Sequence, residues 1–156
     1  MFGNLSSEEI EKVLHSQPVG RIGCHADGQT YVVPISYVYD AGYIYCYTQE
    51  GKKTAIMRAN PHVCFQTDDM NNMANWKSVI AWGEYEELPG GTQRREALKK
   101  LTDRVLPMIS SERSHVSADW PFTNHETEQV KGVIFRIRLT EKTGRFERSA
   151  RSVVIV

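Results

Sequence analysis

The sequence predicts a mainly β fold, in which an antiparallel β-barrel carries flanking helices. About six segments have the β-branched and aromatic content of strands, and short turns join most consecutive strands. The expected helices do not alternate regularly with the strands, as they would in a doubly wound α/β fold. We therefore expect a six-stranded antiparallel sheet that curls into a barrel, with helices at its ends.

The first expected element is a helix that begins after Ser6. Ser6 stands three residues before Glu9, the spacing of a capping box that satisfies two backbone donors at a helix start. The apolar residues that follow recur at helical spacing. Pro18 disfavours helical geometry at the residue before it, so the helix should end near Ser16.

Three strands are expected next, at residues 19–24, 31–39 and 43–48. Asp27-Gly28 is a strong hairpin signal, because glycine adopts a positive φ at little cost. Pro34 interrupts the second strand. Since proline has no N–H to donate, we expect this strand at a sheet edge or bulge, where backbone groups are free to bond something other than a strand. A plain solvent-facing edge is the alternative.

Residues 51–60 predict a second, short helix that Asn60-Pro61 ends. Its expected packing face consists of Ala55, Ile56 and Ala59.

Two further strands are predicted at residues 62–67 and 78–88, with the polar stretch 68–75 between them as a loop. Gly83 in the second of these strands indicates a bend or a close backbone approach.

A third helix, capped by Thr92, should end at Pro107. Residues 110–128 show no clear period. Strict alternation predicts a final strand over residues 130–140, and the basic stretch 142–148 predicts a turn or an extension of that strand.

Length and charge restrict the classes of function. We expect one domain over residues 1–156, because domains average roughly 150 residues. The 19 basic and 19 acidic side chains cancel, which argues against a nucleic-acid or membrane-surface partner. The sequence contains no run of 18 apolar residues and no charged-then-apolar leader, so we expect a soluble, cytoplasmic protein with reduced cysteines.

Most well-known cofactor motifs are absent from the sequence. It contains neither the GxGxxG of a Rossmann site nor the HExxH of a zinc protease. Gly51-Lys52 is followed by Lys53 instead of the serine or threonine that a P-loop requires. His62 and Cys64 share one face of a strand but lack a third ligand, so we predict no metal site.

A phosphate-binding set is the remaining candidate. Thr48, Gly51, Lys52, Lys53 and Thr54 supply hydroxyls, ammonium groups and free backbone N–H groups at a helix start. Two cations there oppose the helix dipole, so a bound anion would stabilise them. The alternative is a solvated lysine pair.

The order of these segments resembles the flavin-binding split-barrel proteins, the superfamily of pyridoxamine 5′-phosphate oxidase. It is most similar to the branch called pyridoxamine-phosphate-oxidase-like or 5-nitroimidazole-resistance (Nim) proteins. The resemblance rests on a VPISY strand, a GKK helix start, an NPHVCF strand and a WKSV strand, and it covers about residues 5–88 well.

The resemblance implies a six-stranded split barrel that binds FMN, with FAD as the alternative, in a cleft between the subunits of a homodimer. In such proteins the backbone of one strand would bond the polar edge of the flavin ring, and the matching residues here are Val33, Pro34, Ile35 and Ser36. A second set would hold the phosphate and consists of Tyr47, Thr48, Lys52 and Lys53. A third set would line the cleft from the other subunit and consists of Trp76, Lys77 and Ser78.

Function follows from the same resemblance. We expect an FMN-dependent oxidoreductase that acts on a small molecule, and the sequence identifies no catalytic residue. Trp120 and Phe122 are expected either to cover the open face of the flavin ring or to pack in a dimer interface. Nim-type members often carry a histidine where Tyr47 stands, which argues against nitroimidazole reduction. The pyridoxal-phosphate-binding residues of true pyridoxamine-phosphate oxidases have no clear match. The alternatives are a non-catalytic flavin-, haem- or deazaflavin-binding module and an oligomeric barrel without a cofactor.

Overall fold

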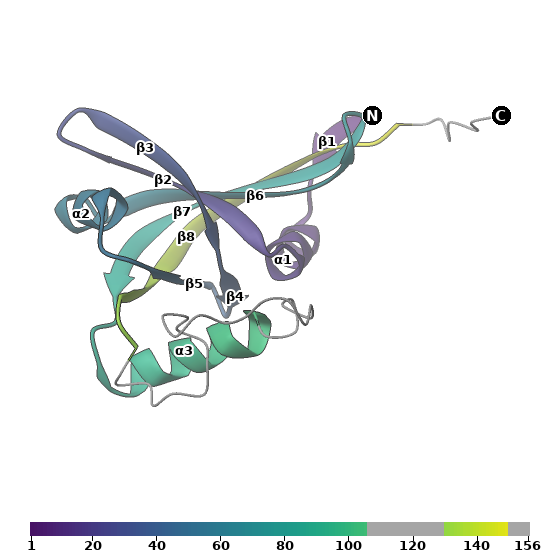
Figure 1. The fold of residues 1–156 in the computed structure, drawn as a ribbon. Helices are drawn as coiled ribbons and strands as arrows, with labels where there is room; N and C mark the ends of the chain where they lie inside the picture. Colours follow the sequence, from purple (N-terminus) through teal and green to yellow (C-terminus); the bar gives the residue numbers. More distant parts are fainter. Residues whose placement is uncertain (106–129, 150–156) are drawn as a thin grey trace, which may run out of the picture.

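The computed structural model describes residues 1–105 and 130–149, and these form one antiparallel sheet with helices around it (Figure 1). The strands are β1 Phe2–Asn4, β2 Val19–Ala26, β3 Gln29–Ser36, β4 Val38–Asp40, β5 Tyr43–Thr48, β6 His62–Asn72, β7 Asn75–Glu87 and β8 Val133–Glu147. The helices are α1 Ser7–Ser16, α2 Lys52–Ala59 and α3 Gly91–Val105. The predicted mainly β, antiparallel barrel with flanking helices is confirmed.

The strands follow the order β3-β2-β6-β7-β8-β5-β4, and β1 pairs with β8. β3 and β5 are far apart along this path, yet they contact each other, so the sheet curls into a split barrel. Two of the two-residue hairpin turns adopt positive φ, at Asp27-Gly28 and at Ala41-Gly42.

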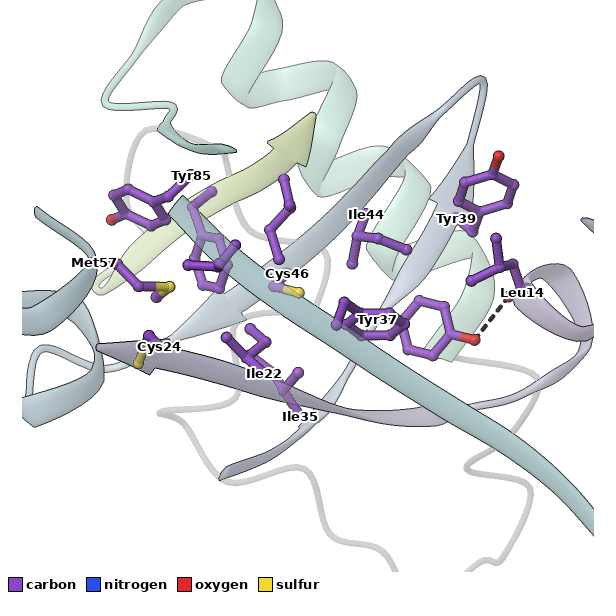
Figure 2. Packing of buried hydrophobic residues seen from close by; sticks show 14 of the residues in the cluster. Leu14, Ile22, Cys24, Ile35, Tyr37, Tyr39, Ile44, Cys46, Met57 and Tyr85 are labelled. Carbon is purple, nitrogen blue, oxygen red and sulfur yellow. Dashed lines mark hydrogen bonds between the residues drawn. The ribbon is translucent and has the colours of Figure 1, made fainter. Parts of the chain in front are cut away.

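The predicted number of strands is wrong, because the described residues form eight strands instead of six. β1 was not expected, and the predicted strand 31–39 is divided at Tyr37 into β3 and β4. The Tyr37 side chain is 2% exposed, and its hydroxyl donates a 2.7 Å hydrogen bond to the Leu14 carbonyl of α1 (Figure 2). The chain therefore turns inward at this residue and cannot continue one flat strand.

The barrel core lies between the two halves of the sheet (Figure 2). Phe65 and Phe135 are fully buried, and Phe65 meets Tyr37 edge-on with 4.8 Å between ring centroids. Helix α1 closes one end with Leu14, and its predicted capping box between Ser6 and Glu9 is confirmed. A second apolar cluster joins α3 to β5 and β8.

The predicted loop 68–75 is wrong. β6 continues to Asn72 and pairs with β7 from Asn75, so the two strands form a long hairpin that turns at Met73-Ala74. Its polar residues bond across the sheet: Asp68 accepts a 2.9 Å hydrogen bond from Arg21. Strand polarity here reflects side chains that face solvent, not a loop.

Gly83 marks a close backbone approach, as predicted. The β7–β8 register shifts between Trp82 and Gly83, and a Cβ at Gly83 would lie 2.3 Å from the Arg138 carbonyl oxygen. β8 extends through the basic stretch to Glu147, which confirms the strand extension, but it begins at Val133.

Two details of the helices differ from expectation. α2 buries Thr54, Ile56 and Met57, whereas Ala55 and Ala59 are exposed. α3 begins at Gly91, so Thr92 lies in its first turn and does not cap it. Residues 110–128, with Trp120 and Phe122, lie outside the described residues. None of the described helices is long and apolar enough to span a membrane.

Candidate functional site

The open edge of β3 forms one side of the candidate site. β3 is the first strand of the sheet path and pairs with β2 alone among the described strands, with Pro34 opposite Arg21. The predicted edge position is therefore confirmed. Ile35 is buried and Val33 half-buried, while Pro34 and Ser36 are exposed. Alternate backbone groups of this segment face outward from the sheet, because only every second residue of an antiparallel strand bonds a given neighbour.

The start of α2 forms the other side of the site. Gly51 precedes the helix and has no side chain to accept from the N–H groups of the first turn. The Thr54 hydroxyl accepts from the Gly51 N–H at 3.0 Å and donates to the Gly51 carbonyl at 2.8 Å. Thr54 is fully buried. Its hydroxyl therefore shapes the turn that begins the helix.

The two lysines differ in position. Lys52 is exposed and lies over the Tyr31 ring of β3, with 5.3 Å between the ammonium nitrogen and the ring centroid. Lys53 is half-buried. Burial raises the pKa of the Cys24 and Cys46 thiols, and the positive charge of Lys53 offsets part of each rise. Lys53 thus lies near these two thiols, where α2 packs against β2.

Tyr47 and Thr48 end β5 just before this helix. The Tyr47 hydroxyl donates to the Lys131 carbonyl at 2.7 Å and accepts from the Gln49 side-chain amide at 2.8 Å. Thr48 is buried, and its hydroxyl donates to the Gln49 carbonyl at 3.3 Å. Tyr47 therefore fastens the β5–α2 connection to the segment that precedes β8.

Trp76, Lys77 and Ser78 lie elsewhere in the molecule. They begin β7 at the tip of the β6–β7 hairpin, at the opposite end of the sheet from α2 (Figure 1). The Trp76 indole N–H donates to Glu147 at 3.0 Å, and the Ser78 hydroxyl accepts from Gln66 at 3.1 Å. One chain therefore leaves this third set apart, while Lys52 of the second set contacts Tyr31 of β3, the strand that carries the first set.

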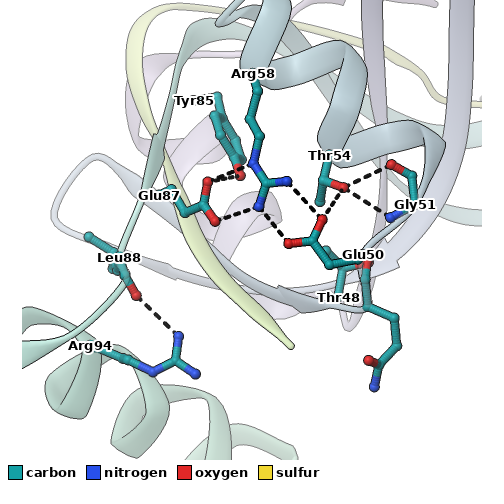
Figure 3. Close-up of polar contacts among 10 residues, drawn as sticks. Thr48, Glu50, Gly51, Thr54, Arg58, Tyr85, Glu87, Leu88 and Arg94 are labelled. Atoms are coloured by element: carbon teal, nitrogen blue, oxygen red, sulfur yellow. Dashed lines mark hydrogen bonds and ion pairs between the residues drawn. The ribbon is translucent and has the colours of Figure 1, made fainter. Parts of the chain in front are cut away.

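A cluster that the sequence did not suggest adjoins the helix start (Figure 3). Arg58 forms two 2.7 Å hydrogen bonds with Glu50 and bonds of 2.9 and 2.7 Å with Glu87. The Tyr85 hydroxyl donates to Glu87 at 3.2 Å. We call Arg58, Glu50 and Glu87 the Arg58 cluster. The spacing of Arg58 and Glu50 is a weak local signal, but Glu87 joins them only through the position of β7.

In the Arg58 cluster one guanidinium pairs with two carboxylates. Hydrogen bonds from Arg58 lower the pKa of both Glu50 and Glu87. Burial raises the pKa of Tyr85, and the nearby Glu87 carboxylate raises it further. Both carboxylates are therefore charged at neutral pH and tied to one guanidinium.

An apolar row crosses the outer face of β3, β2, β6 and β7. Val32, Gly23, Cys64 and Trp82 lie side by side in register, and they line a shallow hollow of about 710 Å³. Val32 is 63% exposed and Trp82 39%. Within residues 1–105 and 130–149, no group of three histidine, cysteine or acidic side chains is placed to hold a metal ion.

Comparison with known proteins places the chain in a family. The family model described as pyridoxamine 5′-phosphate oxidase matches residues 6–146. A crystal structure of an FAD-binding protein from Mesorhizobium loti superposes with a TM-score of 0.72 at 33% identity, over 94% of this chain and 98% of that one. The structure of a candidate 5-nitroimidazole antibiotic resistance protein from Bacteroides thetaiotaomicron shares the fold, with a TM-score of 0.70 at 16% identity over 94% and 87% of the two chains.

A curated relative adds a shorter match. An uncharacterized protein of Rhizobium meliloti (strain 1021) is 38% identical over 85 residues, which are 54% of this chain and 56% of the relative's length. The family model, in contrast, spans nearly the whole of the described fold. The chain therefore belongs to the pyridoxamine 5′-phosphate oxidase family.

Proposed function

We propose that the protein binds a flavin and acts as an FMN-dependent oxidoreductase on a small molecule. The observation that carries this proposal is the convergence of an open strand edge and an uncapped helix start. β3 and α2 both pack on β2, and Lys52 over Tyr31 joins the two directly. An open edge suits the polar rim of a flat ring, and the helix start suits a phosphate.

Each set of residues has a role in this proposal. The backbone of Val33–Ser36 bonds the polar edge of the flavin ring. Thr48, Lys52, Lys53 and the first N–H groups of α2 hold the phosphate, and Tyr47 fixes the connection between them. The flavin itself supplies hydride or electron transfer, so the protein needs no nucleophile of its own.

We propose that the site is completed in a homodimer of single-domain chains, each spanning residues 1–156. Trp76, Lys77 and Ser78 begin β7 at the opposite end of the sheet from α2, and a partner would supply them at a shared cleft. The exposed apolar row with Val32 and Trp82 offers a surface for a second copy, since burying exposed apolar side chains favours association.

The test of flavin binding is the absorbance spectrum of the purified protein, followed by titration with FMN. A yellow protein, or quenching of FMN fluorescence on addition of a colourless one, is the expected result. A colourless protein that binds neither FMN nor FAD would overturn the proposal. The structural relative from M. loti is described as FAD-binding, so flavin released by denaturation should be identified by chromatography.

Turnover requires a separate experiment. Bleaching of the bound flavin by NAD(P)H and recovery of the colour with an electron acceptor are expected of an oxidoreductase. A flavin that stays oxidised with every reductant tried would favour the alternative, a non-catalytic flavin-binding module, and a Soret band instead of flavin bands would favour a haem-binding one.

A further inference from the structure

We propose that Arg58 is a positioning residue of the phosphate site, because it holds the Glu50 carboxylate beside the Thr54 hydroxyl and off the backbone N–H groups that begin α2. This inference rests on the proposed function. It concerns a residue that neither belongs to the predicted phosphate set nor lies in its sequence motif. Arg58 stands in the last turn of α2, about one and a half turns from the lysines.

Glu50 is a potential competitor of a bound phosphate. It directly precedes Gly51, and one of its carboxylate oxygens lies 3.3 Å from the Thr54 hydroxyl in the first turn of α2. Carboxylates just ahead of a helix are favoured ligands of the free N–H groups at its start, by the same charge and dipole that attract a phosphate. A Glu50 carboxylate that is not bonded to Arg58 would therefore occupy these N–H groups or repel the phosphate.

Arg58 removes this competition through geometry. Two of its nitrogens bond the two Glu50 oxygens at 2.7 Å each, which fixes the plane and direction of the carboxylate (Figure 3). Glu87 holds the same guanidinium at 2.9 and 2.7 Å from β7. The β5–α2 connection is thereby held to the sheet through Glu87, and Glu50 is paired with a guanidinium that it shares with this second carboxylate.

Substitutions at Arg58 and Glu50 should change the affinity for FMN, which carries the phosphate, and not the affinity for riboflavin. Arg58→Gln frees Glu50, so FMN should dissociate about tenfold more readily, while riboflavin, which lacks the phosphate, should change by less than about twofold. The double variant Glu50→Gln with Arg58→Gln should restore most of the FMN affinity, because the competing charge is gone. Glu50→Gln alone should bind FMN at least as tightly as the unmodified protein.

Arg138 provides a matched control, because it also joins two glutamates. It bonds Glu84 at 2.8 Å and Glu86 at 3.2 Å, and its side chain is 43% exposed against 41% for Arg58. Arg138→Gln should leave the ratio of FMN to riboflavin affinity unchanged. Fluorescence titration with each flavin measures all of these dissociation constants.

Three outcomes would overturn the inference while leaving flavin binding intact. They are equal losses of FMN and riboflavin affinity in Arg58→Gln, no rescue by the added Glu50→Gln, and weakened FMN binding by Glu50→Gln alone. If Arg58→Gln does not fold, Arg58→Lys keeps the charge without the bidentate bonds and should show a smaller loss of the same kind. Failure of the unmodified protein to bind FMN would instead contradict the proposed function.

Discussion

Lys52 lies over the ring of Tyr31, 5.3 Å from its centroid, so the first lysine of the helix start is engaged with the neighbouring strand. Its neighbour Lys53 is half-buried. Two adjacent lysines that look equivalent in the sequence therefore face different surroundings. A cation–π contact at an exposed site is weak, whereas water and salt screen a half-buried lysine less in its interaction with an anion.

Lys53→Ala should weaken FMN binding much more than Lys52→Ala does. We expect a loss of about tenfold or more for FMN in Lys53→Ala and a change within about threefold in Lys52→Ala, since the Lys52 ammonium is exposed and shared with the Tyr31 ring, whereas Lys53 is half-buried. Riboflavin titrated in parallel is the control. Equal losses of FMN and riboflavin affinity in Lys53→Ala would show that Lys53 does not touch the phosphate.

Gly83→Ala should destabilise the barrel. The new Cβ would meet the Arg138 carbonyl oxygen at 2.3 Å, and backbone on both strands must shift to relieve the overlap. Such overpacking costs about 1–3 kcal/mol or more of unfolding free energy. The matched control is Gly23→Ala on β2, whose Cβ would lie 3.7 Å from Cys64 in ordinary contact. Urea denaturation that shows equal stability for both variants would contradict this prediction.

The sequence reveals features that one residue determines by its own chemistry. Pro34 predicts an edge strand because it lacks an N–H, and Asp27-Gly28 predicts its turn because of backbone conformation. The break at Tyr37 is hidden, since its aromatic ring favours a strand and only the bond to Leu14, 23 residues away, turns it inward. Asp68 looks like a loop residue because its partner Arg21 lies 47 residues away.

The same limit applies to the candidate site. The run Gly51-Lys52-Lys53 is visible in the sequence because its members are adjacent. The Arg58 cluster is not, because Glu87 reaches Arg58 only after β7 has paired in the sheet. The distance between Trp76 and α2 is likewise a property of the assembled sheet.

Alkaline pH should reveal the burial of Tyr37. Burial raises the pKa of Tyr37 from 10.0 to about 12, so the folded state keeps a proton that the unfolded chain loses. The contribution of the neutral Tyr37 side chain to the free energy of unfolding is complete below pH 10. It is lost as the pH rises from 10 to 12, by about 3 kcal/mol for a shift of about two pKa units. Tyr37→Phe cannot ionise and should lose correspondingly less stability over that range.

Urea denaturation at several pH values between 8 and 12 measures this difference. At pH 8 Tyr37→Phe should be less stable than the unmodified protein by about 1 kcal/mol, because the hydrogen bond to Leu14 is lost. The gap should close as the pH rises. The variant should still lose some stability at alkaline pH, since burial also raises the pKa of Tyr85. Parallel stability curves for the two proteins would contradict the prediction.

A shared cleft predicts complementation between two defective chains. Lys53→Ala removes a group from one side of each site, and Lys77→Ala removes a group that we expect the partner to supply. A heterodimer of the two variants has one site with both substitutions and one site with neither. Co-expression with different affinity tags isolates this heterodimer, and it should bind one FMN with unmodified affinity. Binding as weak as in the parent homodimers would show that each site belongs to a single chain, and a monomer by light scattering would contradict the dimer itself.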